Sequence, residues 1–455
     1  MKDRIFIANG QGFWGDNVDA PYQLVTGGPL DYLTLDYLAE VTMSIMQRQR
    51  IKKPETGYAT DFVQVIERIL PHLMKKNIKV IANAGGVNPE ACRTAVMQVA
   101  KKLGVKGLKV AVVHGDNVLD RIPEFEKAGV ALNSMDSGES LYDLVRNGHE
   151  VLSANVYMSS KPLVEALEKG AQIVIAGRTT DTGLAMAPMI HEFGWSWDDW
   201  NKLAAGTVAG HIIECGAQCT GGNYTKWRDV PDLWNVGYPI VEAHSDGTFY
   251  VTKHDGTGGL VTLDTVSEQL VYEMGDPKTY ITGDVVADFT SIRLAQDGSN
   301  RVRVSGVTGK PSTDFFKVSA SYLKGYKATG QLTVSGPDAL EKARLCSDIV
   351  WRRLERAGVT FKETSTEYLG VNTCHEGIVP APAHPNEVVL RVGVKDPDRK
   401  KVDRFGKEIA PLVTSGPPGV TGFAGGRPKP QEIVAFFPAL IPKSLIELTV
   451  SVEIS

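Results

Sequence analysis

Four side chains able to perform acid–base, thiol or metal chemistry lie close together in the sequence: His211, Glu214, Cys215 and Gln218. We expect residues 208–219 to form a helix, in which positions three and four apart share one face. An imidazole beside a carboxylate suits proton transfer, and a thiol suits nucleophilic attack. The i, i+4 spacing of His211 and Cys215 would also suit zinc. We therefore take Glu214, His211 and Cys215 as candidate catalytic residues and Gln218 as a candidate substrate ligand.

Glycine is frequent around this segment, at Gly206, Gly210, Gly216, Gly221 and Gly222. A glycine in a helix interior costs up to about 1 kcal/mol relative to alanine, so a surface helix would not favour these residues. We expect another group to approach this backbone closely. Ordinary packing is the alternative, with a hydrogen-bonded histidine and small buried cysteines filling a core.

Short apolar runs that end in small or polar residues predict the strands that would position these side chains. They occupy residues 4–8, 32–35, 79–82, 109–113, 151–154 and 173–176. Residues 62–76 and 89–103 carry apolar side chains near the period of a helix. Strands that alternate with helices favour a parallel sheet. We expect residues 1–230 to form an α/β domain whose parallel, Rossmann-like sheet is flanked by helices.

Polar residues follow several of the predicted strands, and ligands of open parallel sheets bind beyond the carboxyl ends of the strands. Asp36 and Glu40 stand four apart on one face, and we take them as further catalytic candidates. Candidate substrate-binding residues at this strand-end cleft are Gly12, Trp14, Asp16, Asn83, Gly85, Gly86, Arg178 and Asp181. Asp116 and Asn155 also follow strands, where Asp and Asn most often form turns or helix caps.

The run Gly10-Gln11-Gly12-Phe13-Trp14-Gly15 matches the dinucleotide-binding pattern after a first strand. Asp36 follows at about 20 residues, where an acid can bind the ribose. Phe13 and Trp14 are bulky at the point where a pyrophosphate would approach, which counts against the match. A nucleotide-cofactor oxidoreductase therefore remains one alternative.

The sequence changes character beyond residue 190. The tryptophans within residues 193–200 indicate a packed joint or a subunit contact, and we expect a homo-oligomer. From Tyr238 onward, hairpin-like strand patterns dominate, with one clear helix at residues 338–356. We expect residues 231–455 to form an α+β domain packed against the first.

A glycine loop follows the first predicted hairpin of this second domain. Gly258 and Gly259 end the run that begins at His254. Successive backbone amides of such a loop can cradle a phosphate or a thioester, and we take both glycines as candidate substrate-binding residues. A tight turn would explain them equally well.

Composition narrows the class of protein. Of 455 residues, 42% are hydrophobic and 22% charged, as in globular proteins. A net charge of −4 gives no general electrostatic reason to bind nucleic acid or an anionic membrane, and no apolar run approaches the ~18 residues of a membrane span. The charged start predicts no signal peptide, and an odd number of cysteines does not indicate a disulfide framework. We expect a cytoplasmic protein.

Several separate motifs, in order along the chain, together resemble the acyclic terpene utilisation family of the AtuA type. They are Gly12-Phe13-Trp14-Gly15-Asp16; Asp36-Tyr37-Leu38-Ala39-Glu40; Asn83-Ala84-Gly85-Gly86 with Asn88-Pro89; Gly177-Arg178 with Asp181; Gly210-His211 with Glu214-Cys215-Gly216 and Gln218; and Thr265-Val266 with Glu268-Gln269-Leu270. The resemblance covers essentially the whole chain, in the form consisting of the N-terminal domain without a further C-terminal domain. The chain departs from the family pattern at Asn117, which stands where the family has an acid, and at Cys219, which matches no cysteine of the family.

The resemblance implies a role in the bacterial breakdown of citronellol and geraniol through coenzyme A thioesters. The first hypothesis is a lyase or hydratase of a branched carboxylic acid or its coenzyme A ester, in which Glu214 or His211 moves a proton next to a carbonyl. The second is a metal- or thiol-dependent hydrolase that uses Cys215. The third is a non-catalytic partner subunit of an acyl-coenzyme A enzyme. The sequence specifies no cofactor, and a divalent metal fits only the second hypothesis.

Overall fold

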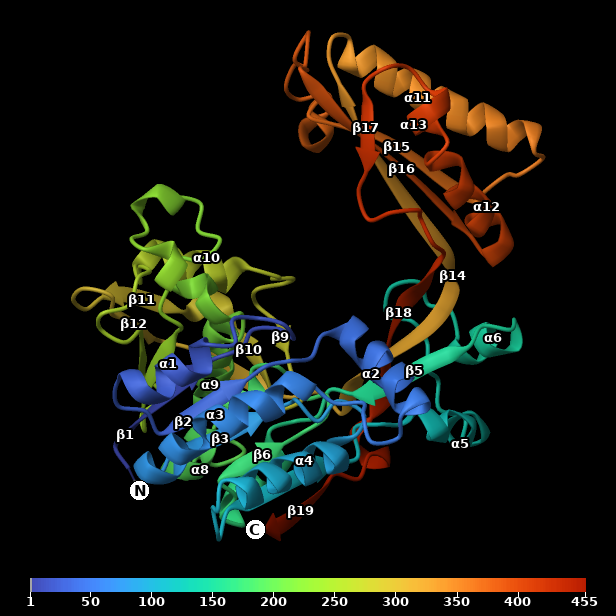
Figure 1. Ribbon diagram of the computed structural model, residues 1–455. Helices are drawn as coiled ribbons and strands as arrows, with labels where there is room; N and C mark the ends of the chain where they lie inside the picture. Colours follow the sequence, from blue (N-terminus) through green and yellow to red (C-terminus); the bar gives the residue numbers. More distant parts are fainter. Residues whose placement is uncertain (1) are drawn as a thin grey trace. The chain divides into compact units, whose positions relative to one another are not determined.

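The computed structural model describes residues 2–455 (Figure 1). The chain divides into two compact units. A main unit comprises the residues up to Ser321 together with Phe436–Ser455, and an inserted unit comprises Tyr322–Ala435. The boundary expected near residue 230 falls within the main unit, because strands that follow it pair with the sheet formed by the first strands.

Within the described residues, the main sheet has ten strands in the order β11-β12-β8-β7-β1-β2-β3-β6-β4-β19. The central strands run parallel, and they are β1 (Arg4–Asn9), β2 (Tyr32–Leu35), β3 (Lys79–Ala82), β6 (Ile173–Ile175) and β4 (Lys109–His114). Antiparallel strands extend both edges, and they are β7 (Ile240–His244), β8 (Phe249–Thr252), β12 (Val302–Ser305), β11 (Arg293–Gln296) and β19 (Thr449–Ile454). The predicted mixed α/β class with parallel strands is confirmed.

The strand order differs from that of a Rossmann sheet, which reverses beside its first strand. Here β1 has parallel β2 on one side and antiparallel β7 on the other. The strand expected at residues 151–154 forms as β5 (Val151–Val156), but it pairs with β14 (Phe315–Ser335) instead of joining the parallel strands.

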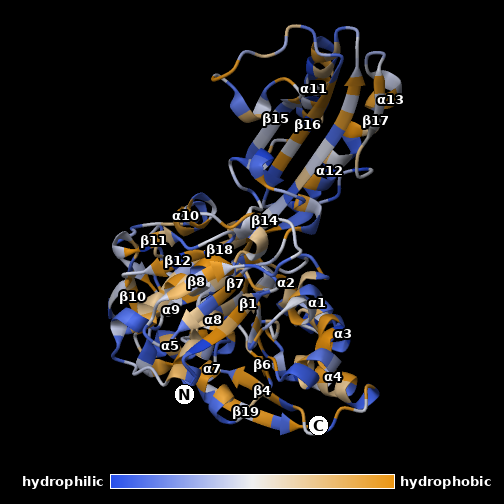
Figure 2. Ribbon diagram, turned by 90° about the vertical axis from the view of Figure 1, so that its left-hand side faces the viewer, coloured by the Kyte–Doolittle hydropathy of each residue, from blue (hydrophilic) through white to orange (hydrophobic). Residues whose placement is uncertain are grey.

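Helices cover both faces of the main sheet, and two hydrophobic cores result. The first core is formed by α1 (Ala20–Gly27), α2 (Glu40–Lys52), α3 (Thr60–Lys76) and α4 (Pro89–Lys102), and the second by α7 (Lys161–Glu168), α8 (Gly183–Phe193) and α9 (Trp200–Ile213). Ile7 and Ala8 of β1 lie in opposite cores, because successive side chains of a strand point to opposite faces. The strands between these layers are mostly hydrophobic (Figure 2). The predicted helices at residues 62–76 and 89–103 are confirmed as α3 and α4.

The smaller elements of the main unit surround this sheet. They are α5 (Ile122–Lys127), α6 (Leu141–Arg146), α10 (Leu263–Val271) and a separate sheet of β13 (Thr308–Pro311), β10 (Val285–Asp288) and β9 (Tyr280–Ile281). Among residues 2–455, no helix is both long and apolar enough to cross a membrane.

The inserted unit is a sheet of antiparallel strands covered by helices, as expected for an α+β region. Its strands β15 (Glu363–Leu369), β16 (Glu387–Asp396), β14 and β17 (Val420–Phe423) lie in that order, and β18 (Gln431–Pro442) also pairs with β14. Alternate residues of β14 and β16, such as Leu332 and Leu390, share a core with α11 (Ala339–Arg356), α12 (Arg399–Ile409) and the short α13 (Leu412–Ser415).

Candidate functional site

The helix that carries the candidate acid–base pair is α9, and it begins and ends earlier than the sequence predicted. The helix covers Trp200–Ile213 rather than residues 208–219, and Glu214 stands at its C-terminal cap. The side-chain amide of Asn9, at the end of β1, donates to the carbonyl oxygens of Ile213 at 2.8 Å and Glu214 at 2.9 Å. These bonds satisfy acceptors that a helix end leaves free. The cap therefore lies at the carboxyl end of β1, where the site was expected.

The chain turns sharply directly after Glu214. Gly216 has a φ of 59°, a left-handed conformation that glycine adopts without strain. A short 3-10 helix, Gly216–Thr220, follows. Gln218 belongs to this second element, so it does not continue the face of α9 as predicted.

The groups that closely approach the glycine backbone belong to the chain itself. A Cβ atom on Gly12 would lie 2.7 Å from the carbonyl carbon of Cys215, and one on Gly210 would lie 2.5 Å from the Cα of Thr182. The Gly12 amide also donates to Asp16 Oδ2 at 2.9 Å. Tight packing inside the protein explains these glycines without a ligand.

The dinucleotide-binding pattern is likewise used internally. The Gly10 amide donates to the Thr34 carbonyl at 2.9 Å, and Asp16 Oδ1 accepts from the Tyr238 hydroxyl at 2.6 Å. Asp36, the expected ribose ligand, is buried. The amides of Gly10 and Gly12 both have acceptors within the chain, so neither is free to bind a pyrophosphate. This argues against the oxidoreductase alternative.

Glu214 and His211 form a buried pair. His211 Nδ1 lies 3.0 Å from Glu214 Oε1, and Nε2 lies 3.1 Å from the carbonyl oxygen of Gln269. Tyr280 and Phe289 pack edge-on against the imidazole, with ring centroids at 5.4 and 5.3 Å. These contacts fix the ring, so one oxygen of Glu214 is held while Oε2 is buried without a hydrogen-bond partner among the described residues.

Burial raises the pKa of Glu214 to about 7, and the nearby Asp181 carboxylate adds to this effect, although the hydrogen bond with His211 opposes it. Burial alone would lower the pKa of His211, but the bond to Glu214 raises it above its usual value. A carboxyl group with a pKa near neutrality that is hydrogen-bonded to an imidazole suits the role of a general acid or base.

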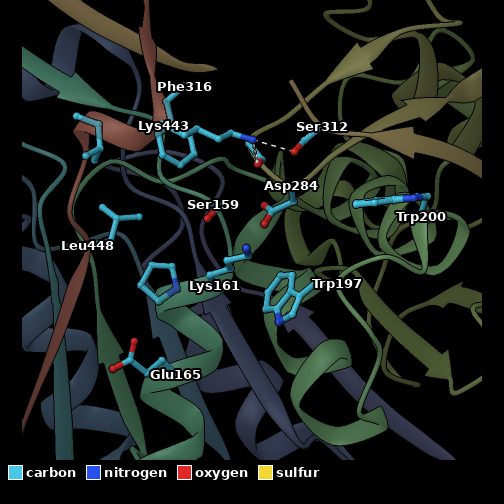
Figure 3. A pocket seen from close by; sticks show the side chains of 13 residues that line it. Ser159, Lys161, Glu165, Trp197, Trp200, Asp284, Ser312, Phe316, Lys443 and Leu448 are labelled. Carbon is cyan, nitrogen blue, oxygen red and sulfur yellow. Dashed lines mark hydrogen bonds between the residues drawn. The ribbon is translucent and has the colours of Figure 1, made fainter. Parts of the chain in front are cut away.

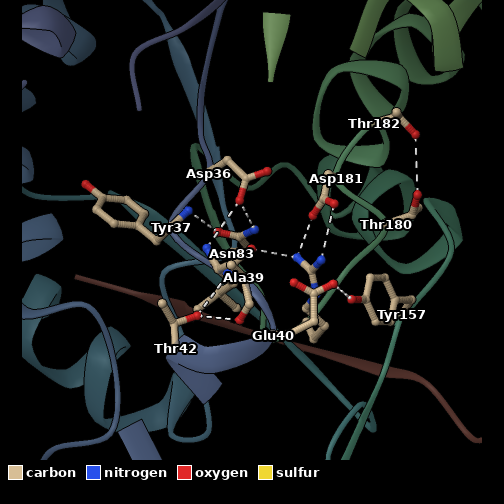
Figure 4. Close-up of polar contacts among 12 residues, drawn as sticks. Asp36, Tyr37, Ala39, Glu40, Thr42, Asn83, Tyr157, Thr180, Asp181 and Thr182 are labelled. Carbon is tan, nitrogen blue, oxygen red and sulfur yellow. Dashed lines mark hydrogen bonds and ion pairs between the residues drawn. The ribbon is translucent and has the colours of Figure 1, made fainter. Parts of the chain in front are cut away.

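Asp36 is a second buried carboxyl group, held by the neighbouring strand (Figure 4). Its Oδ1 accepts from Asn83 Nδ2 at 2.6 Å and from the Leu38 amide at 3.2 Å. Asn83 Oδ1 in turn accepts from the Tyr37 amide at 2.7 Å. Burial and the charge of Asp181 raise the pKa of Asp36 well above its usual range, although Arg178 and the hydrogen bond from Asn83 oppose this shift.

Arg178 pairs with Asp181, a further acid whose charge acts on both Asp36 and Glu214. Its guanidinium donates to both oxygens of Asp181 and to the Leu38 carbonyl at 2.8 Å, and it lies 4.1 Å from the centre of the Tyr157 ring. The Tyr157 hydroxyl donates to Glu40 Oε1 at 2.6 Å (Figure 4). Although burial acts to raise the pKa of Glu40, this hydrogen bond and nearby Arg178 hold it below its usual value. The guanidinium is thus paired with Asp181, while its Nε is buried without a hydrogen-bond partner among the described residues.

We call Asp36, Glu40, Asn83, Tyr157, Arg178, Asp181, His211 and Glu214 the acidic cluster. Asp36, Asp181 and Glu214 line one small cavity together with Asn9, Thr34 and Gly210. The cavity has room for about one water molecule. The structure thus brings Asp36, Asn83, Arg178, Asp181, His211 and Glu214 together at the strand ends, with Glu40 bonded through Tyr157 at its border.

Cys215 adjoins Glu214 but is poorly suited to nucleophilic or metal chemistry. Burial and the neighbouring Glu214 carboxylate raise the pKa of its thiol to about 12, whereas reactive cysteines have lowered pKa values. Both ring nitrogens of His211 are engaged. Among residues 2–455, no group of three His, Cys, Asp or Glu side chains is arranged to hold a metal ion.

The other predicted substrate ligands have structural contacts. The amides of Gly258 and Gly259 donate to the carbonyls of Asn235 at 2.9 Å and Pro231 at 2.8 Å, so this loop is a turn and leaves no free amide at these positions. The Gly85 amide donates to the Ala176 carbonyl at 2.9 Å, and Gly86 has a positive φ of 53°. Trp14 is partly buried against the core that α1–α4 share with the main sheet.

Residues 193–200, which we call the tryptophan connector, also pack inward. Trp195 is buried, and its indole donates to the Ser245 carbonyl at 3.0 Å. Trp197 and Trp200 are partly buried against the same core. The connector therefore packs within the main unit, which is one of the two roles that its composition indicated.

Sequence reasoning missed Asn9, Tyr157, Gln269 and Tyr280 as parts of the site. Gln269 belongs to one of the family-like motifs, and its side-chain amide donates to the His211 carbonyl at 3.0 Å, so motif position could have indicated it. Asn9 and Tyr157 follow strands, which is a weak signal. Tyr280 reaches His211 only through tertiary packing.

Comparison with known protein families identifies the family of this chain. A family model described as "Acyclic terpene utilisation family protein AtuA" matches residues 5–452. The chain belongs to this family. The match covers both the acidic cluster and the inserted unit, as the motif resemblance implied. No curated protein and no solved structure gave a significant match.

Proposed function

We propose that this AtuA family member is an enzyme of carboxylic acid or acyl-coenzyme A catabolism that moves a proton next to a carbonyl, as a lyase or hydratase does. The observation that carries the proposal is the state of Glu214. Its carboxyl group has a pKa near 7 and one hydrogen-bonded oxygen, and the other oxygen lacks a partner among the described residues. An oriented base with a pKa near the working pH is the most effective kind.

The remaining members of the acidic cluster have complementary roles in this proposal. Glu214 Oε2 takes the proton from the carbon beside the carbonyl, and the electron pair moves to the carbonyl oxygen. Asp36 accepts hydrogen bonds through Oδ1, and its pKa is raised well above its usual range. We assign its Oδ2 the role of a hydrogen-bond donor toward the developing negative charge. His211 holds Glu214 in place and shares its proton.

The cavity beside Glu214 offers a place for the water molecule that a hydratase adds or removes. The space shared by Asp36, Asp181 and Glu214 fits about one water molecule. Water is the second reactant of a hydratase, and a base beside it can activate it. Family membership supports a substrate derived from an acyclic terpene, and we propose a branched acid or its coenzyme A thioester.

The thiol- or metal-dependent hydrolase is the weaker candidate, because the Cys215 thiol stays protonated and His211 has no free nitrogen. No observation favours the oxidoreductase. A non-catalytic partner subunit is the outcome of the test below that would replace the proposal.

The test is hydrogen exchange at carbon. Purified protein is incubated in D₂O with a panel of branched acyl-coenzyme A thioesters and their free acids, and mass spectrometry follows deuterium uptake beside the carbonyl. Uptake that requires the protein supports the proposal for that substrate. If no member of the panel exchanges or changes composition, the proposed activity is wrong and the partner-subunit role takes its place.

A further inference from the structure

A second pocket in the main unit lies outside the acidic cluster (Figure 3). Its volume is about 350 Å³, within the range of small-molecule sites. Its walls come from the start of α7, the tryptophan connector, the turn before β10 and the segment between β18 and β19. Neither the proton-transfer proposal nor the sequence motifs use it.

Two lysines face this pocket without a carboxylate partner. Lys443 Nζ donates to the Gly283 carbonyl and to Ser312 Oγ, both at 2.8 Å and both neutral. Lys161 Nζ lies 5.4 Å from the centre of the Trp197 ring. Among the described residues, neither ammonium lies within ion-pairing distance of an acid. Burial lowers the pKa of Lys443, so an anion bound there would replace lost solvation.

The acids of the pocket have hydrogen-bond or ion-pair partners of their own, although the charge of Asp284 also acts on both lysines. Asp284 accepts from the Ser160 amide at 2.9 and 3.0 Å and from its hydroxyl at 3.0 Å, which holds the start of α7. Glu165 pairs with Lys169 at 2.7 Å, further along that helix. With Glu165 paired to Lys169, two lysines face the single carboxylate of Asp284, so the pocket keeps one positive charge in excess.

Aromatic rings form the rest of the wall. Trp197, Trp200 and Phe316 line the pocket, and Figure 3 shows both indoles on one side of it. Flat aromatic surfaces favour planar rings, with which they stack. The pocket therefore suits a ligand that carries both an anionic group and a planar ring. We propose that this pocket binds a nucleotide, with its phosphates on Lys161 and Lys443 and its base against the tryptophans.

The pocket and the acidic cluster are close along two segments of chain. Tyr157 of the cluster is two residues from Ser159 of the pocket, and Tyr280, which contacts His211, is four from Asp284. Because a chain spans at most about 3.6 Å per residue, the two sites lie within roughly 15 Å of each other. A free nucleotide and the nucleotide end of a coenzyme A thioester share the proposed chemistry, and the experiment below separates them.

Isothermal titration calorimetry with the full chain tests the proposal, using ADP, coenzyme A, adenosine and inorganic phosphate as probes. We expect ADP and coenzyme A to bind, and adenosine and phosphate to bind at least about tenfold more weakly, because each lacks one half of the recognised structure. Tighter binding of coenzyme A than of ADP assigns the thioester as the natural ligand, and the reverse assigns a free nucleotide. If neither nucleotide binds at millimolar concentration, or phosphate binds as tightly as ADP, the proposal is overturned. These titrations do not depend on proton transfer, so they can succeed where that activity fails.

Variants locate the binding. Lys161→Met and Lys443→Met should each weaken ADP binding about tenfold, as loss of a charged hydrogen bond does. Lys310→Met, at an exposed lysine of β13, is the matched control and should bind as the parent does. Thermal unfolding checks the fold of each variant. Lys161 forms no hydrogen bond through its ammonium in the structure, so Lys161→Met keeps the test valid even if Lys443→Met misfolds. Unchanged ADP binding by Lys161→Met would overturn the assignment.

Discussion

Replacing Glu214 with glutamine should change how the stability of the protein depends on pH. Burial raises the pKa of this carboxyl group from 4.5 to about 7, so between these values the folded protein keeps a proton that the unfolded chain has released. The free energy of unfolding therefore falls as pH rises through this window. At pH values above this window, the difference between the two pKa values lowers the free energy of unfolding by about 3 kcal/mol. Glutamine does not titrate, and its oxygen can still accept the bond from His211.

The assay is urea unfolding of the parent and of Glu214→Gln at about pH 5 and about pH 8, followed by tryptophan fluorescence. The variant should gain stability relative to the parent between the two pH values, by about 3 kcal/mol. Glu150→Gln, at an exposed glutamate, is the control and should show no such gain. An equal difference between parent and Glu214→Gln at both pH values would refute the raised pKa and the role built on it.

Three further substitutions probe the rest of the cluster. Cys215→Ser should retain near-parent turnover of any substrate found, because a thiol with a pKa near 12 is not the nucleophile; a hundredfold loss would revive the thiol hydrolase. Asn83→Ala should lower the free energy of unfolding by about 1–3 kcal/mol, since it leaves the Tyr37 amide without an acceptor and removes the shorter of two hydrogen bonds to Asp36 Oδ1, and urea unfolding measures this. Arg178→Met should lower the free energy of unfolding by about 1–3 kcal/mol, because it removes the partners of the Leu38 carbonyl and of Asp181, whose side chain is 36% exposed; Arg178→Lys should recover part of it, and equal losses in both variants would argue against the ion pair.

Much of the main sheet could be predicted because its signals are local. The apolar runs at β1, β2, β3, β4 and β6 and the helical periods of α3 and α4 each specify an element within a few residues of sequence. The gathering of Asp36, Asn83, Arg178 and Glu214 also followed from a general rule on strand ends.

The rest depends on contacts between distant parts of the chain. The end of α9 is set by Asn9, which lies about 200 residues away in sequence, and the edge position beside β1 is taken by antiparallel β7. The limits of the inserted unit reflect pairing within Tyr322–Ala435, which no composition change marks. Gly206 and Gly210 of α9 lie at close approaches, as expected, but the sequence could not indicate that the partner was the chain itself.

The most direct test of the central claim is the pH profile of deuterium uptake beside the carbonyl of an exchanging substrate. If Glu214 is the base, the uptake rate should rise with pH, with a midpoint near 7, and level off above it. In Glu214→Gln the rate should fall by about a hundredfold or more and lose this midpoint. Uptake that continues at the parent rate in a folded Glu214→Gln variant, or that shows no midpoint in the parent, would contradict the assignment of Glu214 as the group that moves the proton.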